Sequence, residues 1–166
     1  MMSWGKIYIF LLITLSSVYS QFSGKELIVD GAVLKGKVLD GVKVREVIGD
    51  VVITQEDVVI TCERAIYYIA SNNAELIGNV VITQDSIVIR TEKGRYFGDI
   101  QIAYSDSTVR LNDGSMNLIA DKGNYNLNTK VANFFGNVKF SDSVTTLIST
   151  KLVYSKNIEE IVAVGN

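Results

Sequence analysis

The sequence contains no proline and no histidine, and it has a single cysteine, Cys62. Without proline, every residue keeps its backbone N–H, so no strand is interrupted by a missing hydrogen-bond donor. Without histidine, the chain lacks the commonest general base and a common metal ligand. One cysteine cannot form an intramolecular disulfide or a zinc site built from several cysteines. These absences argue against catalysis and against a metal centre.

Charge is also low, since the 166 residues have a formal net charge of -2, and no basic run occurs. We therefore expect no nucleic-acid partner. Acidic residues are scattered, with no Ser/His/Asp set and no cluster at metal-ligand spacing, so we predict no enzyme, no cofactor and no metal site. The composition, 48% hydrophobic and 20% charged, is typical of a folded protein, and the length suggests one domain.

The first 20 residues have the pattern of an export signal. Lys6 precedes an apolar run over residues 7–18, and Val18-Tyr19-Ser20 offers a cleavage site after Ser20. The run is shorter than the roughly 20 residues that span a membrane. We therefore predict a signal peptide over residues 1–20 and an exported mature protein. Retention of this segment as an N-terminal anchor is the alternative.

The chain does contain an internal repeat of 29 residues, which relates segments 48–67, 77–96, 106–125 and 135–154. A fixed period is the signature of a repeat architecture, and terminal repeats are often divergent. We divide residues 21–166 into a divergent unit 21–48 and repeats 49–77, 78–106, 107–135 and 136–164. Four tyrosines mark the period: Tyr67, Tyr96, Tyr125 and Tyr154.

Within each repeat, apolar residues alternate with polar ones, which predicts half-buried β-strands. No window shows the 3.6-residue period of a helix, so we predict an all-β domain. Comparison of the repeats separates two faces, because strand side chains alternate between them. One position is always large and aliphatic, and we place it inside: Ile60, Ile89, Leu118 and Leu147. Two others drift toward polar residues, and we place them outside: Val59, Val88, Asn117 and Thr146; Val52, Val81, Arg110 and Lys139.

Inward residues from all repeats form the candidate lining of an apolar groove: Ile53, Ile60, Tyr67, Ile82, Ile89, Tyr96, Leu111, Leu118, Tyr125, Phe140, Leu147 and Tyr154. The tyrosine column would either line a groove for an apolar ligand or form a stacked ladder that stabilises the sheet. These two interpretations are compatible, since the lining of an empty groove is also a core.

A basic column lies three residues before the tyrosines and should face the other way: Arg64, Lys93, Lys122 and Lys151. It would contact phosphates of an anionic lipid or glycan, or form a solvated, charge-balanced rim. The positions equivalent to Cys62 hold small residues, so we expect a packed side chain and not a reactive thiol. Glycine-asparagine pairs such as Gly78-Asn79 predict corners with positive φ.

The repeated unit, with Gly-Asn-Val, a turn, a strand and Lys-x-x-Tyr, resembles the OstA-like family. This family contains the periplasmic lipopolysaccharide-transport protein LptA and the N-terminal domain of the outer-membrane protein LptD. The closest matches are residues 45–51 and Gly136-Asn137-Val138. The resemblance covers residues 22–166, and Ser107-Thr108 departs from it in place of Gly-Asn.

The resemblance implies an open-ended, twisted β-jelly roll whose two sheets form a V-shaped apolar trough for lipid acyl chains. It further implies that the exported protein works in the periplasm and carries lipopolysaccharide or a related lipid toward the outer membrane. Its partners would be LptC-like and LptD-like OstA-like domains and further copies of itself, joined by edge strands. If Asn166 is the natural terminus, the last strands would offer such an edge.

Two other interpretations stay open. A structural β-solenoid, serving as an adhesin or scaffold, would have a tightly filled core and no ligand cavity. A membrane-anchored LptC-like component would require that residues 1–20 are retained.

Overall fold

The computed structural model describes residues 26–165, and these form an all-β domain, as the alternation predicts. The predicted signal peptide over residues 1–20 lies outside the described residues, as does Asn166. The strands are β1 (Ile28–Asp30), β2 (Val33–Leu39), β3 (Val42–Gln55), β4 (Val58–Tyr68), β5 (Asn73–Gln84), β6 (Ile87–Phe97), β7 (Ile102–Ser105), β8 (Val109–Asn112), β9 (Asn117–Ala120), β10 (Lys122–Asn126), β11 (Val131–Ser141), β12 (Thr146–Ser155) and β13 (Glu160–Val164). Two short 3₁₀ turns, η1 (Ile69–Ser71) and η2 (Lys156–Ile158), follow β4 and β12.

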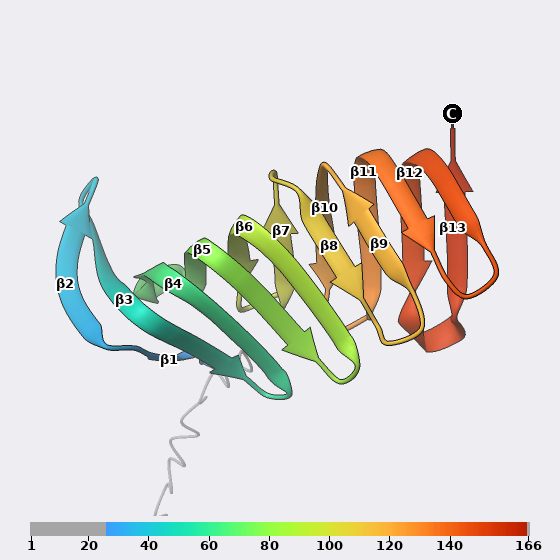
Figure 1. The fold of residues 1–166 in the computed structure, drawn as a ribbon. Coiled ribbons are helices and arrows are strands. Elements are labelled where there is room, and N and C mark those ends of the chain that lie inside the picture. The colour runs from blue at the N-terminus through green and yellow to red at the C-terminus, as the bar shows by residue number, and fades with distance from the viewer. Residues whose placement is uncertain (1–25, 166) are drawn as a thin grey trace, which may run out of the picture.

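These strands form one antiparallel sheet of 13 strands that folds into two layers (Figure 1). Each long strand bends near its middle, so that its two halves belong to different layers. Layer A contains β2, β7, β10, β13 and the half-strands 42–48, 64–68, 73–77, 93–97, 131–135 and 151–155. Layer B contains β1, β8, β9 and the half-strands 51–55, 58–62, 80–84, 87–91, 138–141 and 146–149. The result is an open-ended roll of the jelly-roll type, in which β8 and β9 lie in front of β7 and β10.

The edge of the roll where the long strands bend from one layer into the other is called the corner here, and glycines produce the bends in β3, β5 and β11. Gly49, Gly78 and Gly136 have φ of 77°, 78° and 74°, and the next residue also has a positive φ in each case. The strand pairing shifts register at each of these bends. Two consecutive left-handed residues therefore turn the strand by forming a bulge, and glycine takes the first position because it has no Cβ to clash. The prediction of positive-φ corners is confirmed.

The position where Ser107-Thr108 replaces the Gly-Asn pair differs from these three bends. At Ser107-Thr108 the strand is interrupted, so β7 ends at Ser105 and β8 begins at Val109. On the neighbouring strand, β9 and β10 are likewise separated at Asp121. Hydroxyl groups bind one another here, with Thr91 Oγ1 2.8 Å from Ser105 Oγ and 3.1 Å from Ser107 Oγ. The departure from Gly-Asn thus replaces a continuous bend with a break held by side-chain hydrogen bonds.

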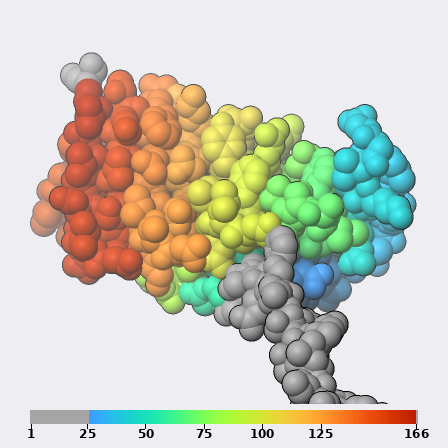
Figure 2. Space-filling view, turned by 180° about the vertical axis from the view of Figure 1, so that it is seen from behind, coloured from blue at the N-terminus to red at the C-terminus, as the bar shows by residue number. Residues whose placement is uncertain are grey.

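The two ends of the roll are sheet edges. β2 lies at one end and β13 at the other, as the cyan and red ends of Figure 2 also show from behind. Every residue of β13 is exposed, and so are six of the seven residues of β2. In the part of the chain that the structure describes, no helix is long and apolar enough to cross a membrane.

Candidate functional site

The twelve predicted groove residues converge on the space between layers A and B. Eleven of them are at most 5% exposed, and Leu147, near the β13 end, is half-buried against the same cluster. The assignment of faces is therefore confirmed at these positions. Their neighbours Val52 and Val59 lie outside, at 36% and 40% exposure.

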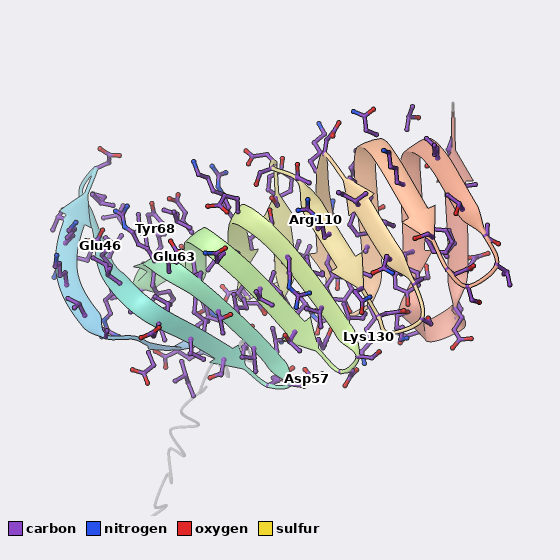
Figure 3. The ribbon with its side chains drawn as sticks, viewed as in Figure 1. Glu46, Asp57, Glu63, Tyr68, Arg110 and Lys130 are labelled. Atoms are coloured by element: carbon purple, nitrogen blue, oxygen red, sulfur yellow. The ribbon has the colours of Figure 1, made fainter. Side chains whose placement is uncertain are left out.

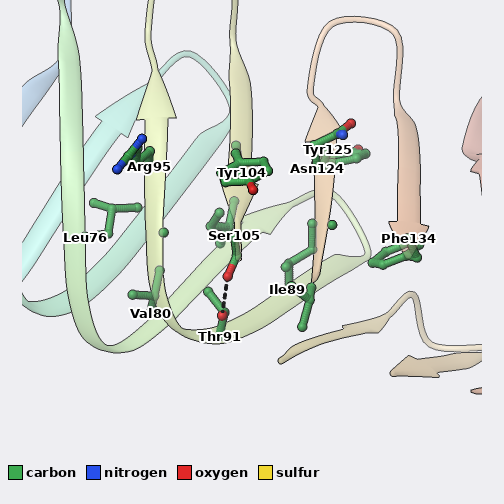
Figure 4. Close-up of a pocket in the computed structure, with 15 residues that line it drawn as sticks. Leu76, Val80, Ile89, Thr91, Arg95, Tyr104, Ser105, Asn124, Tyr125 and Phe134 are labelled. Atoms are coloured by element: carbon green, nitrogen blue, oxygen red, sulfur yellow. Dashed lines mark hydrogen bonds between the residues drawn. The ribbon is translucent and has the colours of Figure 1, made fainter. Parts of the chain in front are cut away.

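Side chains fill this interior, so it is not an open trough. A void of about 20 Å³ remains beside Leu76, Ile89 and Phe134, where the corner is interrupted (Figure 4). That volume is about what one water molecule needs. The V-shaped opening that the resemblance implied is closed here, because large side chains from both layers meet and because polar groups join the layers along the edge opposite the corner. We call that edge the seam.

Tyrosine hydroxyl groups form the inner row of the seam. Tyr96 donates to Gln55 Oε1 at 2.5 Å, and Tyr125 donates to Gln84 Oε1 at 2.9 Å. In the next unit, Tyr154 donates to Asp113 Oδ2 at 2.5 Å. Each tyrosine lies in layer A and each acceptor at the end of layer B, so each bond joins the layers. Burial raises the pKa of all three tyrosines, which therefore stay protonated donors.

The acceptor column is a functional feature that the sequence analysis missed. Gln55, Gln84 and Asp113 are buried and lie 29 residues apart, the same period as the tyrosines. Their shared 29-residue spacing is the sequence signal from which this column could have been predicted. The signal is weak, because a polar residue at the end of a strand is also what the start of an ordinary turn contains.

The turns of the two layers also bind one another along the seam. Gln55 Nε2 donates to the Gly98 carbonyl at 3.1 Å, and Gln84 Nε2 donates to the Leu127 carbonyl at 3.2 Å. Outside them, Lys130 Nζ pairs with Asp85 Oδ2 at 2.5 Å. Figure 3 labels Lys130 at this edge of the molecule. The seam is thus a repeated polar contact over an apolar interior.

Asp113 is the charged member of this row. Burial alone would raise its pKa, but hydrogen bonds from Tyr154, Ser115 and Lys156 outweigh that effect and hold the pKa well below the ordinary value of 3.8. Lys156 Nζ lies 3.2 Å from Asp113 Oδ2. Asp113 is therefore a buried carboxylate that stays ionised because it has enough donors.

The basic column faces outward, away from the tyrosines, as expected. Arg64 is engaged, since its Nε donates to Glu46 Oε1 at 2.8 Å. Glu46 is 3% exposed and also pairs with Lys37. A hydrogen bond from Lys37 is the main cause that lowers the pKa of Glu46. Burial acts in the opposite direction, and the hydrogen bond from Arg64 lowers the pKa further. Lys151 lies over the Phe135 ring, 5.7 Å from its centroid.

Lys93 and Lys122, the remaining members of the column, are exposed. Two of the four members, Arg64 and Lys151, thus contact other side chains of the protein, and phosphate binding by the column stays a prediction. The Cys62 thiol is buried beside the corner, where its Sγ donates to the Arg64 carbonyl at 3.3 Å. Burial is the largest cause that raises its pKa, so it is a packed side chain and not an activated thiol.

The residues 27–164 match the model of the OstA-like protein family, and the chain belongs to this family. The match spans the strands of both layers. Among solved structures, the chain is similar to LptH, described as the LptA homologous periplasmic component of the conserved lipopolysaccharide transport device from Pseudomonas aeruginosa. The two are 14% identical, with a TM-score of 0.35, and the alignment covers 86% of this chain and 84% of that one. A comparison with curated proteins finds no match.

Proposed function

We propose that this protein is a periplasmic component of lipopolysaccharide transport, which holds lipid acyl chains between its two layers and passes them toward the outer membrane. Membership of the OstA-like family carries the proposal. The interior supports it, because the residues buried between the layers are apolar apart from the polar groups of the seam and the hydroxyl groups at the corner. Each CH₂ group buried there would contribute about 0.8 kcal/mol. Transport by this route is passive and needs no catalytic residue.

Acyl chains would enter at the seam. At the corner the layers are joined by continuous backbone in β3, β4, β5, β6, β11 and β12. At the seam they are joined by side-chain hydrogen bonds, of which Tyr125 to Gln84 is one example. A neutral hydrogen bond contributes only about 0.5–1.5 kcal/mol to stability, and a bond to a charged group such as Asp113 about 1.5–3 kcal/mol. The seam therefore separates at a much lower cost than the corner, and opening it exposes the candidate groove residues.

A structural scaffold without ligand is the second candidate, and the filled interior favours it. The void of about 20 Å³ holds no acyl chain. A scaffold would keep the seam closed at all times and would carry no lipid through purification. The LptC-like alternative depends on residues 1–20, and N-terminal sequencing of the purified protein distinguishes it.

The edges of the roll suit assembly with other OstA-like domains, LptC-like or LptD-like, or with further copies. Apolar side chains are exposed on both edges, including Val33 and Leu34 on β2 and Val162 and Val164 on β13. An unpaired strand edge binds another strand through its backbone, and apolar side chains add affinity. End-to-end pairing would extend the interior from one domain to the next.

The test is photo-crosslinking to lipopolysaccharide at inward and outward positions. A photoreactive amino acid replaces Ile60, Ile89 or Leu118 in the purified protein. The matched controls place it one residue earlier, at Val59, Val88 or Asn117, in the same strands but outside. We expect lipid adducts at the inward set and at least about tenfold fewer at the outward set, since strand neighbours face opposite sides. Adducts at the outward positions alone would overturn the proposal.

A further inference from the structure

The outer face of layer B carries a basic groove that neither the family nor the seam accounts for. Its volume is about 530 Å³, and Arg90, Arg110 and Lys139 line it. Figure 3 labels Arg110 on β8, in the front layer of that view. Asn112, Asn117 and Thr146 add polar groups to the same groove. No acidic side chain is among its described lining residues.

The three cations follow one line across the strands. Arg90 pairs in register with Arg110, which pairs with Ile119, which in turn pairs with Lys139. Side chains directly opposite each other have Cβ atoms about 4.5–5.5 Å apart. Since neighbouring strands are about 4.8 Å apart, Lys139 lies roughly 10 Å from Arg110. The groove therefore presents a pair of guanidinium groups and, farther along, an ammonium group.

This arrangement works against the stability of the empty protein. Like charges directly opposite in a sheet are destabilising. Over residues 26–165, no ion pair joins Arg90, Arg110 or Lys139 to an acid. Glu92, two residues after Arg90, is absent from the lining of this groove, but it lines a neighbouring hollow at the corner that Arg90 and Arg110 also line. The two arginines are thus close to each other, and over the described residues none of the three cations forms an ion pair.

A second outer hollow, on layer A, provides the comparison. It has a volume of about 410 Å³ and contains Arg95 and Lys93 together with Glu75 and Asp106. Arg95 pairs in register with Glu75. Acidic residues therefore line the layer A hollow beside its basic residues, whereas no acidic residue lines the layer B groove.

We propose that the layer B groove binds a phosphate-bearing molecule, with Arg90 and Arg110 holding one phosphate group and Lys139 contacting a second anionic group about 10 Å away. Guanidinium groups bind phosphate oxygens in pairs of parallel hydrogen bonds, so two facing arginines suit one phosphate. The proposal does not depend on acyl chains entering the interior. The phosphate would come from a lipid headgroup or from a soluble phosphate compound.

The test is an NMR titration of backbone amides in the ¹⁵N-labelled purified protein at constant ionic strength. One arm adds inorganic pyrophosphate, and the other adds phosphatidylglycerol vesicles, with phosphatidylcholine vesicles as reference. We expect saturable shifts centred on residues 90 and 110 in either arm, extending to residues 119 and 139 only on the vesicles, where a neighbouring headgroup supplies the second anionic group. Saturation with pyrophosphate alone identifies a soluble ligand, and stronger binding to the phosphatidylglycerol vesicles than to phosphatidylcholine identifies a headgroup.

Two variants test whether the observed binding takes place in the layer B groove. Arg110→Gln should weaken binding at least about tenfold, the effect of losing one charge-assisted contact. Arg95→Gln removes the same charge from the layer A hollow and should change the affinity by less than about twofold, because it leaves the groove contacts intact. Equal weakening by both variants would show a nonspecific charge effect and overturn the proposal, as would shifts that do not saturate in either arm.

Discussion

At the scale of single residues, the seam depends on a few buried polar groups whose partners lie 41 residues away in the sequence. The tyrosines were predicted to face inward, and they do. Their partners Gln55, Gln84 and Asp113 could have been found from the shared period. What the sequence could not provide was the pairing between the two columns, because it depends on how far the layers fold over each other.

We expect the hydrogen bonds of this ladder to differ in strength. Tyr154→Phe removes a bond to a carboxylate and should lower the free energy of unfolding by about 2 kcal/mol, against about 1 kcal/mol for Tyr125→Phe, whose acceptor is an amide. Urea denaturation measures both values. Tyr104→Phe, on an exposed tyrosine of β7, serves as the control and should stay within about 0.5 kcal/mol of the unmodified protein.

Asp113 should make stability depend on pH in the acid range. Its pKa is lower in the folded protein than in the unfolded chain, so the unfolded chain binds the proton more readily. The stabilisation is complete above the ordinary pKa of 3.8 and is lost as pH falls below it toward the folded pKa. Asp113→Asn should therefore be less stable than the unmodified protein at pH 6, with a difference that shrinks toward pH 2.5. A constant difference over that range would contradict this account.

At the scale of elements, strand alternation predicted both the strands and their faces, and the glycine pairs predicted the corners. The closure of the interior was not predicted, because the sequence shows which side chains face inward but not the width of the space that they fill. The interruption between β7 and β8 had a visible signal in Ser107-Thr108. To predict the hydroxyl cluster that forms at this corner, the positions of Thr91 and Ser105 in space would also have been needed.

The corners should be sensitive to a single added methyl group. At Gly136, with φ of 74°, a Cβ would lie 2.5 Å from Asp121 Oδ2 and 3.1 Å from Asp121 Cβ. Gly136→Ala should lower the free energy of unfolding by about 1–3 kcal/mol through backbone strain and this contact. Thermal or urea unfolding measures the loss. The control is Gly36→Ala on β2, where a Cβ has open space; a comparable loss there would show that corner geometry is not the cause.

At the scale of the whole molecule, two sheet edges with exposed apolar residues lie at opposite ends of one continuous interior. We expect Val162→Lys combined with Val164→Lys to weaken self-association at least about tenfold, because charged residues on an edge strand oppose strand pairing. Sedimentation velocity over a range of protein concentrations measures this. The control pair, Val81→Lys with Val88→Lys, adds the same charge to the outer face of β5 and β6, near the middle of layer B, and should leave association unchanged. Equal effects of the two pairs would argue against pairing through β13.

The central claim is that the two layers separate at the seam to admit lipid. Spin labels at Ser86 and Asn128, introduced as cysteines in a Cys62→Ala background, would report the distance between two turns that meet at the seam. A second pair at Asp57 and Ser86 lies within layer B and serves as reference. On addition of lipopolysaccharide, we predict that the distance across the seam increases while the reference distance stays the same. An unchanged seam distance in protein that has bound the lipid would contradict the account.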